Sequence, residues 1–195
     1  MSKEISAINK PTGEKHDNLE MRKTDCKEPV KNIEDYVVSL PRWTQLPDIS
    51  LYLEQVLELV NSSLENYLTL DKSGKILTQT MVNNYVKQGY VTPPVKKRYD
   101  KIALASLIVI ATLKDIFTIR EISLLIELAV DVNEPQKSYD HFCKLIEEST
   151  RSALKQSVWN PIKTLGDPKG ICSAAASAFA NKYYVNRVFL AEEKE

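Results

Sequence analysis

Residues 77–99 read LTQTMVNNYVKQGYVTPPVKKRY, and this stretch decides the fold that the sequence predicts. Thr78 is of a residue type that caps helix N-termini, and Gly89 is suited to the left-handed conformation that ends helices. The double proline that follows cannot continue a helix. It leads into Lys96-Lys97-Arg98, which we call the basic step. The stretch therefore predicts a short helix from Thr78 to Gly89, a rigid connection, and a second helix that Asp100 caps.

Outside this stretch, apolar residues recur at helical spacing along much of the chain. The predicted helices cover about residues 48–68, 78–89, 101–116, 118–130, 135–158 and 171–192. Asp48 is a suitable N-cap for the first helix, and Thr118 with Glu121 forms a capping box for the fourth. The helix at about 101–116 is apolar around most of its circumference, which predicts a buried central helix. We therefore expect an all-α fold.

The polarity pattern divides the chain into three parts. Residues 1–39 are polar and aperiodic, which predicts a disordered tail. Residues 40–134 carry the predicted helical core, on which Trp43 is expected to anchor the entering segment, with partner binding as the alternative role for this side chain. Residues 135–195 are expected to form a C-terminal helical extension that packs on the core and either dimerises or binds an effector.

The composition narrows the classes of function. Basic and acidic residues balance at 26 each, so only local charge can select a partner. Three widely spaced cysteines indicate a reducing, cytoplasmic compartment, and no apolar run reaches the length of about 20 residues that crosses a membrane. The two histidines are His16, in the predicted tail, and His141. His141 and Cys143 are two residues apart on a predicted helix and point to different faces, so they do not form a natural metal pair. No phosphate loop or nucleophile motif is present. We therefore expect no enzyme activity, no metal and no cofactor.

Local charge is concentrated around the predicted short helix. Residues 71–101 carry seven basic and two acidic side chains, whereas residues 40–70 carry one basic and four acidic side chains. Lysine and arginine gain affinity for phosphate by releasing counterions, and Asn83 and Asn84 suit bidentate contact with adenine. An ordinary solvated surface is the alternative interpretation of these side chains.

The order of these features resembles the DNA-reading half of a MerR-type winged helix. The residues that carry the resemblance are Val82-Asn83-Asn84-Tyr85-Val86, Gly89-Tyr90, Pro93-Pro94, Arg98-Tyr99, the apolar helix at 101–116 and Phe117-Thr118-Ile119-Arg120-Glu121-Ile122. The resemblance implies a MerR-like helix-turn-helix core, with a divergent wing and additional C-terminal helices. It also implies a DNA-binding regulator of transcription.

A longer stretch, residues 43–128, is similar to the bacterial family known as domain of unknown function 1836. Its marks in this chain are Leu46-Pro47-Asp48, Leu51-Tyr52, Gln55-Val56, Leu77-Thr78, Met81-Val82-Asn83-Asn84-Tyr85-Val86-Lys87, Pro94, Lys97 and Tyr99. This resemblance implies a protein like a transcription regulator and supplies no activity.

The sequence thus predicts a helix that reads double-stranded DNA and a basic step that holds its phosphates. The predicted DNA-binding residues are Thr78, Gln79, Asn83, Asn84, Lys87, Lys96, Lys97 and Arg98. A homodimer is expected, because one short helix gives little sequence specificity. The alternative is a protein-interaction module that kept the winged-helix shape and lost DNA binding. Its cue is that Asn83 stands where the MerR family has an arginine, and that only residues 95–98 remain for a wing.

Overall fold

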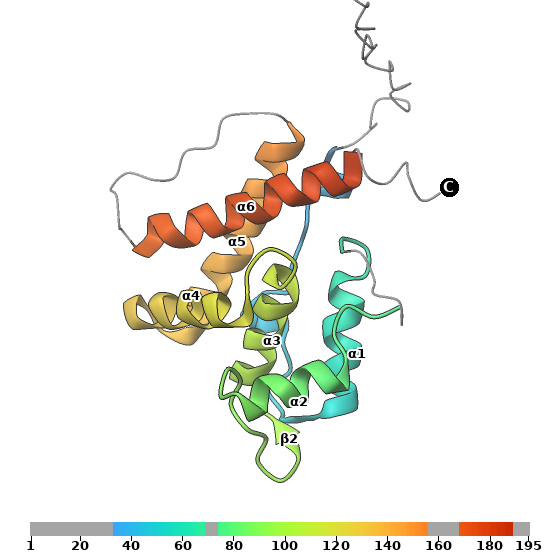
Figure 1. The fold of residues 1–195 in the computed structure, drawn as a ribbon, viewed down its shortest axis with the longest axis vertical. Coiled ribbons are helices and arrows are strands. Elements are labelled where there is room, and N and C mark those ends of the chain that lie inside the picture. The colour runs from blue at the N-terminus through green and yellow to red at the C-terminus, as the bar shows by residue number, and fades with distance from the viewer. Residues whose placement is uncertain (1–32, 69–73, 156–167, 189–195) are drawn as a thin grey trace, which may run out of the picture. The chain divides into compact units, whose positions relative to one another are not determined.

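The structure, a computed structural model, describes residues 33–68, 74–155 and 168–188, and these residues are largely helical, as predicted (Figure 1). The α-helices are α1 (Leu53–Leu64), α2 (Gln79–Lys87), α3 (Lys101–Leu113), α4 (Ile119–Val132), α5 (Pro135–Leu154) and α6 (Pro168–Val188). Two short 3-10 helices, η1 (Ile33–Tyr36) and η2 (Trp43–Gln45), come first. Two short strands, β1 (Leu51–Tyr52) and β2 (Arg98–Tyr99), pair in an antiparallel manner.

Three predicted helix caps are present as hydrogen bonds. The side chains of Thr78 and Asp100 accept from the amide three residues further on, at 3.3 and 2.8 Å. Thr118 and Glu121 form the predicted capping box, in which the carboxylate accepts from the Thr118 amide at 2.7 Å. These caps satisfy amides that the first turn of a helix leaves without partners, and they fix where α2, α3 and α4 begin.

The predicted start of the first helix is wrong. Asp48 does not cap it, because Leu51 and Tyr52 are extended and pair with β2. The helix α1 begins at Leu53, and the Gln55 side chain accepts from the Tyr52 amide at 3.0 Å. Asp48 instead forms an ion pair with Lys101 at 2.6 Å. Strand pairing with a distant segment has therefore overridden a local cap.

The predicted central helix is confirmed as α3. Ten of its 13 residues are buried, and they lie on all sides of the helix. The neighbouring α1 contributes a single buried stripe of Val56, Val60 and Leu64. Because α3 contacts both α1 and α4, its side chains join the first and later helices into one hydrophobic core.

Part of the segment that we assigned to the N-terminal tail belongs to the core. Residues 1–32 lie outside the described part of the chain, but residues 33–39, which we assigned to the tail, are placed against the core. Val37 and Val38 are buried, and the hydroxyl of Tyr183 in α6 donates to the Tyr36 carbonyl at 2.8 Å. Two apolar residues within a charged stretch are too short a pattern to recognise without knowing what they contact.

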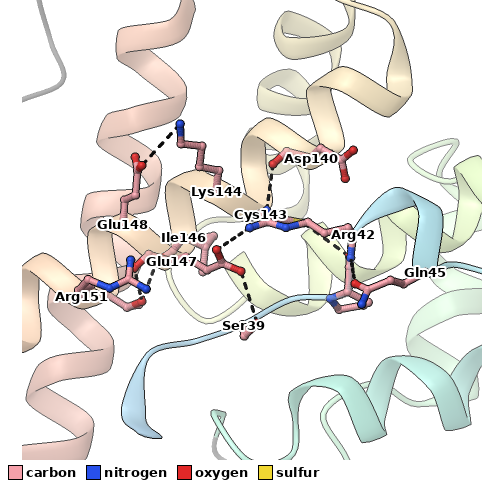
Figure 2. Close-up of polar contacts among 12 residues, drawn as sticks. Ser39, Arg42, Gln45, Asp140, Cys143, Lys144, Ile146, Glu147, Glu148 and Arg151 are labelled. Atoms are coloured by element: carbon pink, nitrogen blue, oxygen red, sulfur yellow. Dashed lines mark hydrogen bonds and ion pairs between the residues drawn. The ribbon is translucent and has the colours of Figure 1, made fainter. Parts of the chain in front are cut away.

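The segment before β1 is fixed to α5 by polar contacts (Figure 2). The Arg42 guanidinium donates to the Asp140 carbonyl at 3.1 Å and forms an ion pair with Glu147. Ser39 donates to the other carboxylate oxygen of Glu147 at 3.4 Å, and the Trp43 amide donates to the Asp140 carboxylate at 2.8 Å. These contacts tie α5 to the part of the chain that precedes α1. The Trp43 ring also meets the Tyr139 ring edge-on at 6.2 Å, as expected for a residue that anchors the entering segment.

The helix α6 packs on α5 and also contacts α4 (Figure 1). Ala175, Ala176 and Ala180 are buried on the packed face, so the small residues of this helix serve packing within the chain. The helix α5 ends at Leu154, earlier than the predicted end near residue 158. The predicted loop that follows lies mostly outside the described residues.

Candidate nucleic-acid interface

The position of α2 depends on one asparagine of α1. The Asn61 side-chain oxygen accepts from the amides of Ile76 and Leu77 at 2.7 and 2.9 Å. Its side-chain amide donates to the carbonyls of Leu77 and Leu57 at 3.0 and 2.7 Å. Asn61 therefore fixes the segment that leads into α2, a role that the sequence did not predict. The available signal was an asparagine in the interior of a helix, where this residue type is unfavourable.

The helix α2 has two distinct faces. Its inward face is formed by Met81, Val82, Tyr85 and Val86, of which Val82 is fully buried. Its exposed residues are Gln79, Thr80, Asn83, Asn84 and Lys87. Positions 79, 83 and 87, and positions 80 and 84, are four residues apart, so these side chains share one side of the helix. The outward face of α2 is therefore polar and uncharged apart from one lysine.

The end of α2 sets the direction of the chain toward the basic step. Gly89 has a φ of +80°, in the left-handed region that favours glycine. The Gly89 amide donates to the Val86 carbonyl at 3.1 Å, and the Tyr90 amide donates to the Tyr85 carbonyl at 2.9 Å. This pair of hydrogen bonds is a Schellman motif, and it stops the helix where the sequence predicted.

A two-residue hairpin turn presents the basic step. The amides and carbonyls of Val95 and Arg98 exchange hydrogen bonds of 2.9 Å in both directions. Between them, Lys96 and Lys97 have φ values of 49° and 64°. Positive φ at both central positions is the signature of a type I′ turn, which matches the twist of paired strands. Residues 95–98 thus form a minimal hairpin, although they are too few for a longer wing.

The two lysines of this turn are strained and exposed. A residue other than glycine in the left-handed conformation raises the free energy of the fold by roughly 1–2 kcal/mol. Both residues of this turn that adopt it are lysines. Both side chains are exposed, and neither forms an ion pair with any residue in the described ranges. The turn and α2 lie at the same end of the view in Figure 1.

Two other basic residues of the cluster are engaged within the protein. Strand pairing sets Arg98 opposite Tyr52, with the guanidinium carbon 4.6 Å from the ring centroid and a 3.1 Å hydrogen bond to the hydroxyl. Lys101 lies 5.2 Å from the centroid of the Trp43 ring and pairs with Asp48. Thr78 is likewise occupied, because its hydroxyl oxygen caps α2. Of the predicted DNA-binding side chains, Thr78 and Arg98 therefore have structural partners.

Acidic groups are exposed along the neighbouring helix α1. Glu54, Glu58 and Glu65 are exposed in α1 and in the turn after it, and α1 contacts α2. An acidic surface repels phosphate, so the geometry restricts where a duplex could approach.

The described part of the chain gives little evidence for a metal site, for a reactive thiol at Cys143 or for a membrane-spanning helix. Cys143 is buried beneath the Arg42 contacts, and burial raises the pKa of its thiol to about 12. Among the described residues, no three His, Cys, Asp or Glu side chains are grouped so that they could hold a metal ion. None of the helices described combines the length and the apolarity needed to cross a bilayer.

Comparison with known proteins gives one result. A family model described as a domain of unknown function (DUF1836) matches residues 41–142. This span runs from the Arg42 contacts through β1, α1, α2, the hairpin turn, α3 and α4 into the first half of α5. No curated protein and no solved structure matches the chain.

Proposed function

Because this chain belongs to the family described as a domain of unknown function (DUF1836), we propose a function from the geometry of the matched residues, 41–142: the domain binds double-stranded DNA as a MerR-like regulator of transcription. One observation carries the proposal. The exposed face of α2 is a strip of carboxamides and hydroxyls, and the turn that follows presents two exposed lysines on strained backbone.

The exposed face of α2 has the chemistry of a reading helix. The major groove of B-DNA is about 12 Å wide and admits an α-helix. Asn83 and Asn84 would contact base edges, since asparagine pairs with adenine through two hydrogen bonds. Gln79 and Lys87 flank them on the same side of the helix and would contact base edges or phosphates.

The hairpin turn would hold the phosphate backbone. Lys96 and Lys97 are free to contact phosphates, and Arg98 would position the turn through Tyr52. We thus assign Arg98 a positioning role in the first instance. The order of elements from β1 through α1, α2, the hairpin and α3 to α4 supports a MerR-like winged helix with a very short wing.

The test is duplex binding by full-length protein, measured by fluorescence anisotropy on sequences enriched by random-site selection. Each neutralised phosphate contributes a slope of about −0.9 in log affinity against log salt concentration. Contacts from Lys87, Lys96 and Lys97 predict a slope of about −2.7 per site, and an added contact from Arg98 makes it about −3.6. A homodimer, which we also propose because one short helix reads few bases, would double these values.

Two double variants separate the roles of helix and turn. Lys96→Glu/Lys97→Glu is expected to abolish binding to all duplexes, whereas Asn83→Ala/Asn84→Ala is expected to lose the preference for the selected sequence and keep the salt slope. The control is Lys137→Glu/Lys182→Glu, which makes the same change in net charge at exposed positions of α5 and α6. If this control weakens binding as strongly as the turn variant, the affinity reflects net charge and the proposed interface is wrong.

A protein-interaction module is the second candidate. It is favoured by the acidic residues of α1, by the engagement of Arg98, and by two large apolar side chains near the sheet, Ile49 at 71% exposure and Val95 at 75%. Such a module predicts no duplex binding at low salt. It also predicts that Ile49→Ser or Val95→Ser abolishes the binding of a partner protein, whereas Lys96→Glu/Lys97→Glu leaves that binding unchanged.

A further inference from the structure

A cavity lies between the helices, on a different part of the molecule from the α2 face. Its volume is about 170 Å³, and its walls come from α3, α4, α5 and the first turns of α6. The cavity is partly open to solvent, so a molecule from solution can reach it. For comparison, an engineered apolar cavity of about 150 Å³ binds benzene.

The walls of the cavity are mostly apolar, and two of the hydroxyl groups in them already donate hydrogen bonds within the protein. Val109, Leu125 and Phe142 contribute hydrocarbon surface from three different helices. The Tyr139 hydroxyl donates to the Pro41 carbonyl at 2.9 Å, and the Ser138 hydroxyl donates to the Ala129 carbonyl at 2.7 Å. In the described part of the chain, no buried side-chain nitrogen or oxygen lacks a hydrogen-bond partner. The interior therefore favours a hydrocarbon or aromatic group.

One cationic side chain, that of Lys169, lies in the lining of the cavity. His141 and Lys169 line it, and Lys169 is exposed and forms no ion pair with the described residues. Burial, and then the ammonium groups of Lys169 and Lys144, lower the pKa of His141. Glu148 offsets part of this charge, since it pairs with Lys144 at 3.7 Å. A negatively charged group at the mouth would meet the ammonium of Lys169.

Apolar exposure continues around the opening. Ile102 of α3 and Val130 of α4 line the cavity and remain 47% and 41% exposed. A ligand that filled the cavity could cover part of this surface, which would add to its affinity in proportion to the apolar area removed from water.

We propose that this cavity is a binding site for a small aryl carboxylate, with the ring among α3, α4 and α5 and the carboxylate at Lys169. A single ring on a short chain suits the volume, and the charge of Lys169 selects an acid over an alcohol or an amine. The site does not depend on the proposed DNA interface, so either can fail without the other. Because α3 and α4 line it together with α5 and α6, the ligand would join the matched core to the C-terminal helices.

The test compares three probes of one shape and different charge: 3-phenylpropionate, 3-phenylpropanol and 3-phenylpropylammonium. Isothermal titration calorimetry on full-length protein is expected to give one site per chain, with affinity falling in that order. Lys169→Ala is expected to weaken the carboxylate about two- to fivefold, the range of an exposed charge pair, and to leave the alcohol within twofold. Equal affinity for all three probes would overturn the assignment of an acid.

Two filling variants test the location. Ala129→Phe in α4 and Ala175→Phe in α6 place a ring in the cavity and are expected to weaken all three probes at least tenfold. The matched control is Ala174→Phe, which makes the same change one residue away at an exposed position of α6 and should leave affinity within twofold. Circular dichroism shows which of the two filling variants keeps the helix content of the wild type, and binding is measured on that variant. The proposal is overturned if the wild-type protein shows no saturable binding, or if a folded filling variant binds as the wild type does.

Discussion

Replacing Asn61 with alanine should destabilise the fold by about 2–4 kcal/mol, because this side chain closes the connection between α1 and α2. Its oxygen is the acceptor for the amides of Ile76 and Leu77, two residues whose side chains are almost completely buried. A buried donor left without a partner costs about 1–3 kcal/mol. Two such amides would give up to about 6 kcal/mol, and we take the lower part of that range because the hydrogen bonds themselves are only partly buried.

The assay is urea unfolding followed by far-ultraviolet circular dichroism, which gives the free energy of unfolding and its slope with denaturant. In a domain of this size the same change lowers the melting temperature by about 5–15 °C. Asn61→Asp keeps the acceptor but loses the two donated hydrogen bonds, so it should fall between alanine and the wild type. The control is Asn66→Ala, the same deletion at an exposed residue just after α1, which should change stability by less than about 0.5 kcal/mol. If Asn61→Ala is no more destabilising than this control, Asn61 does not hold α2 in place.

Three further predictions concern the turn, a helix cap and a thiol. Lys96→Asn/Lys97→Gly places the residues that a type I′ turn prefers at two positions with positive φ. The free energy of unfolding, measured with urea, should therefore rise by about 1 kcal/mol. A fall in this free energy would mean that the turn is not of type I′. Hydrogen bonds from the Thr118 amide and hydroxyl lower the pKa of Glu121. The stabilisation that they give is fully present above the ordinary glutamate pKa of about 4.3. It is lost as the pH falls through the lower pKa that Glu121 has in the folded protein. Glu121→Gln should therefore reduce the acid dependence of the melting temperature between about pH 5 and pH 3, and an unchanged profile would refute this contribution. Burial raises the pKa of Cys143 to about 12, so iodoacetamide at pH 8 should leave this thiol unmodified in folded protein and alkylate it in urea, as peptide mass spectrometry can measure.

Several elements were predictable because their causes lie within a few residues of each other. The caps at Thr78, Asp100 and Thr118 each join a side chain to an amide three residues away, so a short window of sequence contains both partners. The stop at Gly89 is equally local, because it depends on the backbone freedom of one residue. The burial of α3 followed from its composition, since a helix that is apolar on all sides has no face to offer water.

Of the candidate site, the sequence indicated the exposed polar residues of α2, because helical spacing separates them from the apolar face. It also indicated Lys96 and Lys97, because they stand together in a basic segment directly after the double proline. It did not indicate which basic residues are engaged. Tyr52 and Arg98 are 46 positions apart, and only the pairing of β1 with β2 sets one opposite the other. The same pairing converted Asp48 from a predicted cap into a partner of Lys101.

The sequence by itself thus determined the presence of the helices, the caps at Thr78, Asp100 and Thr118, the stop at Gly89 and the distribution of polar side chains on α2. These follow from hydrogen bonds and periodicity within one or two turns. The tertiary structure decided the role of Asn61, the partners of Arg98 and the cavity beside Lys169. Each of these depends on groups that are distant in the chain, and their proximity is set only when the whole core packs around α3. Residue patterns describe what a side chain can do, whereas packing selects which partner it finds.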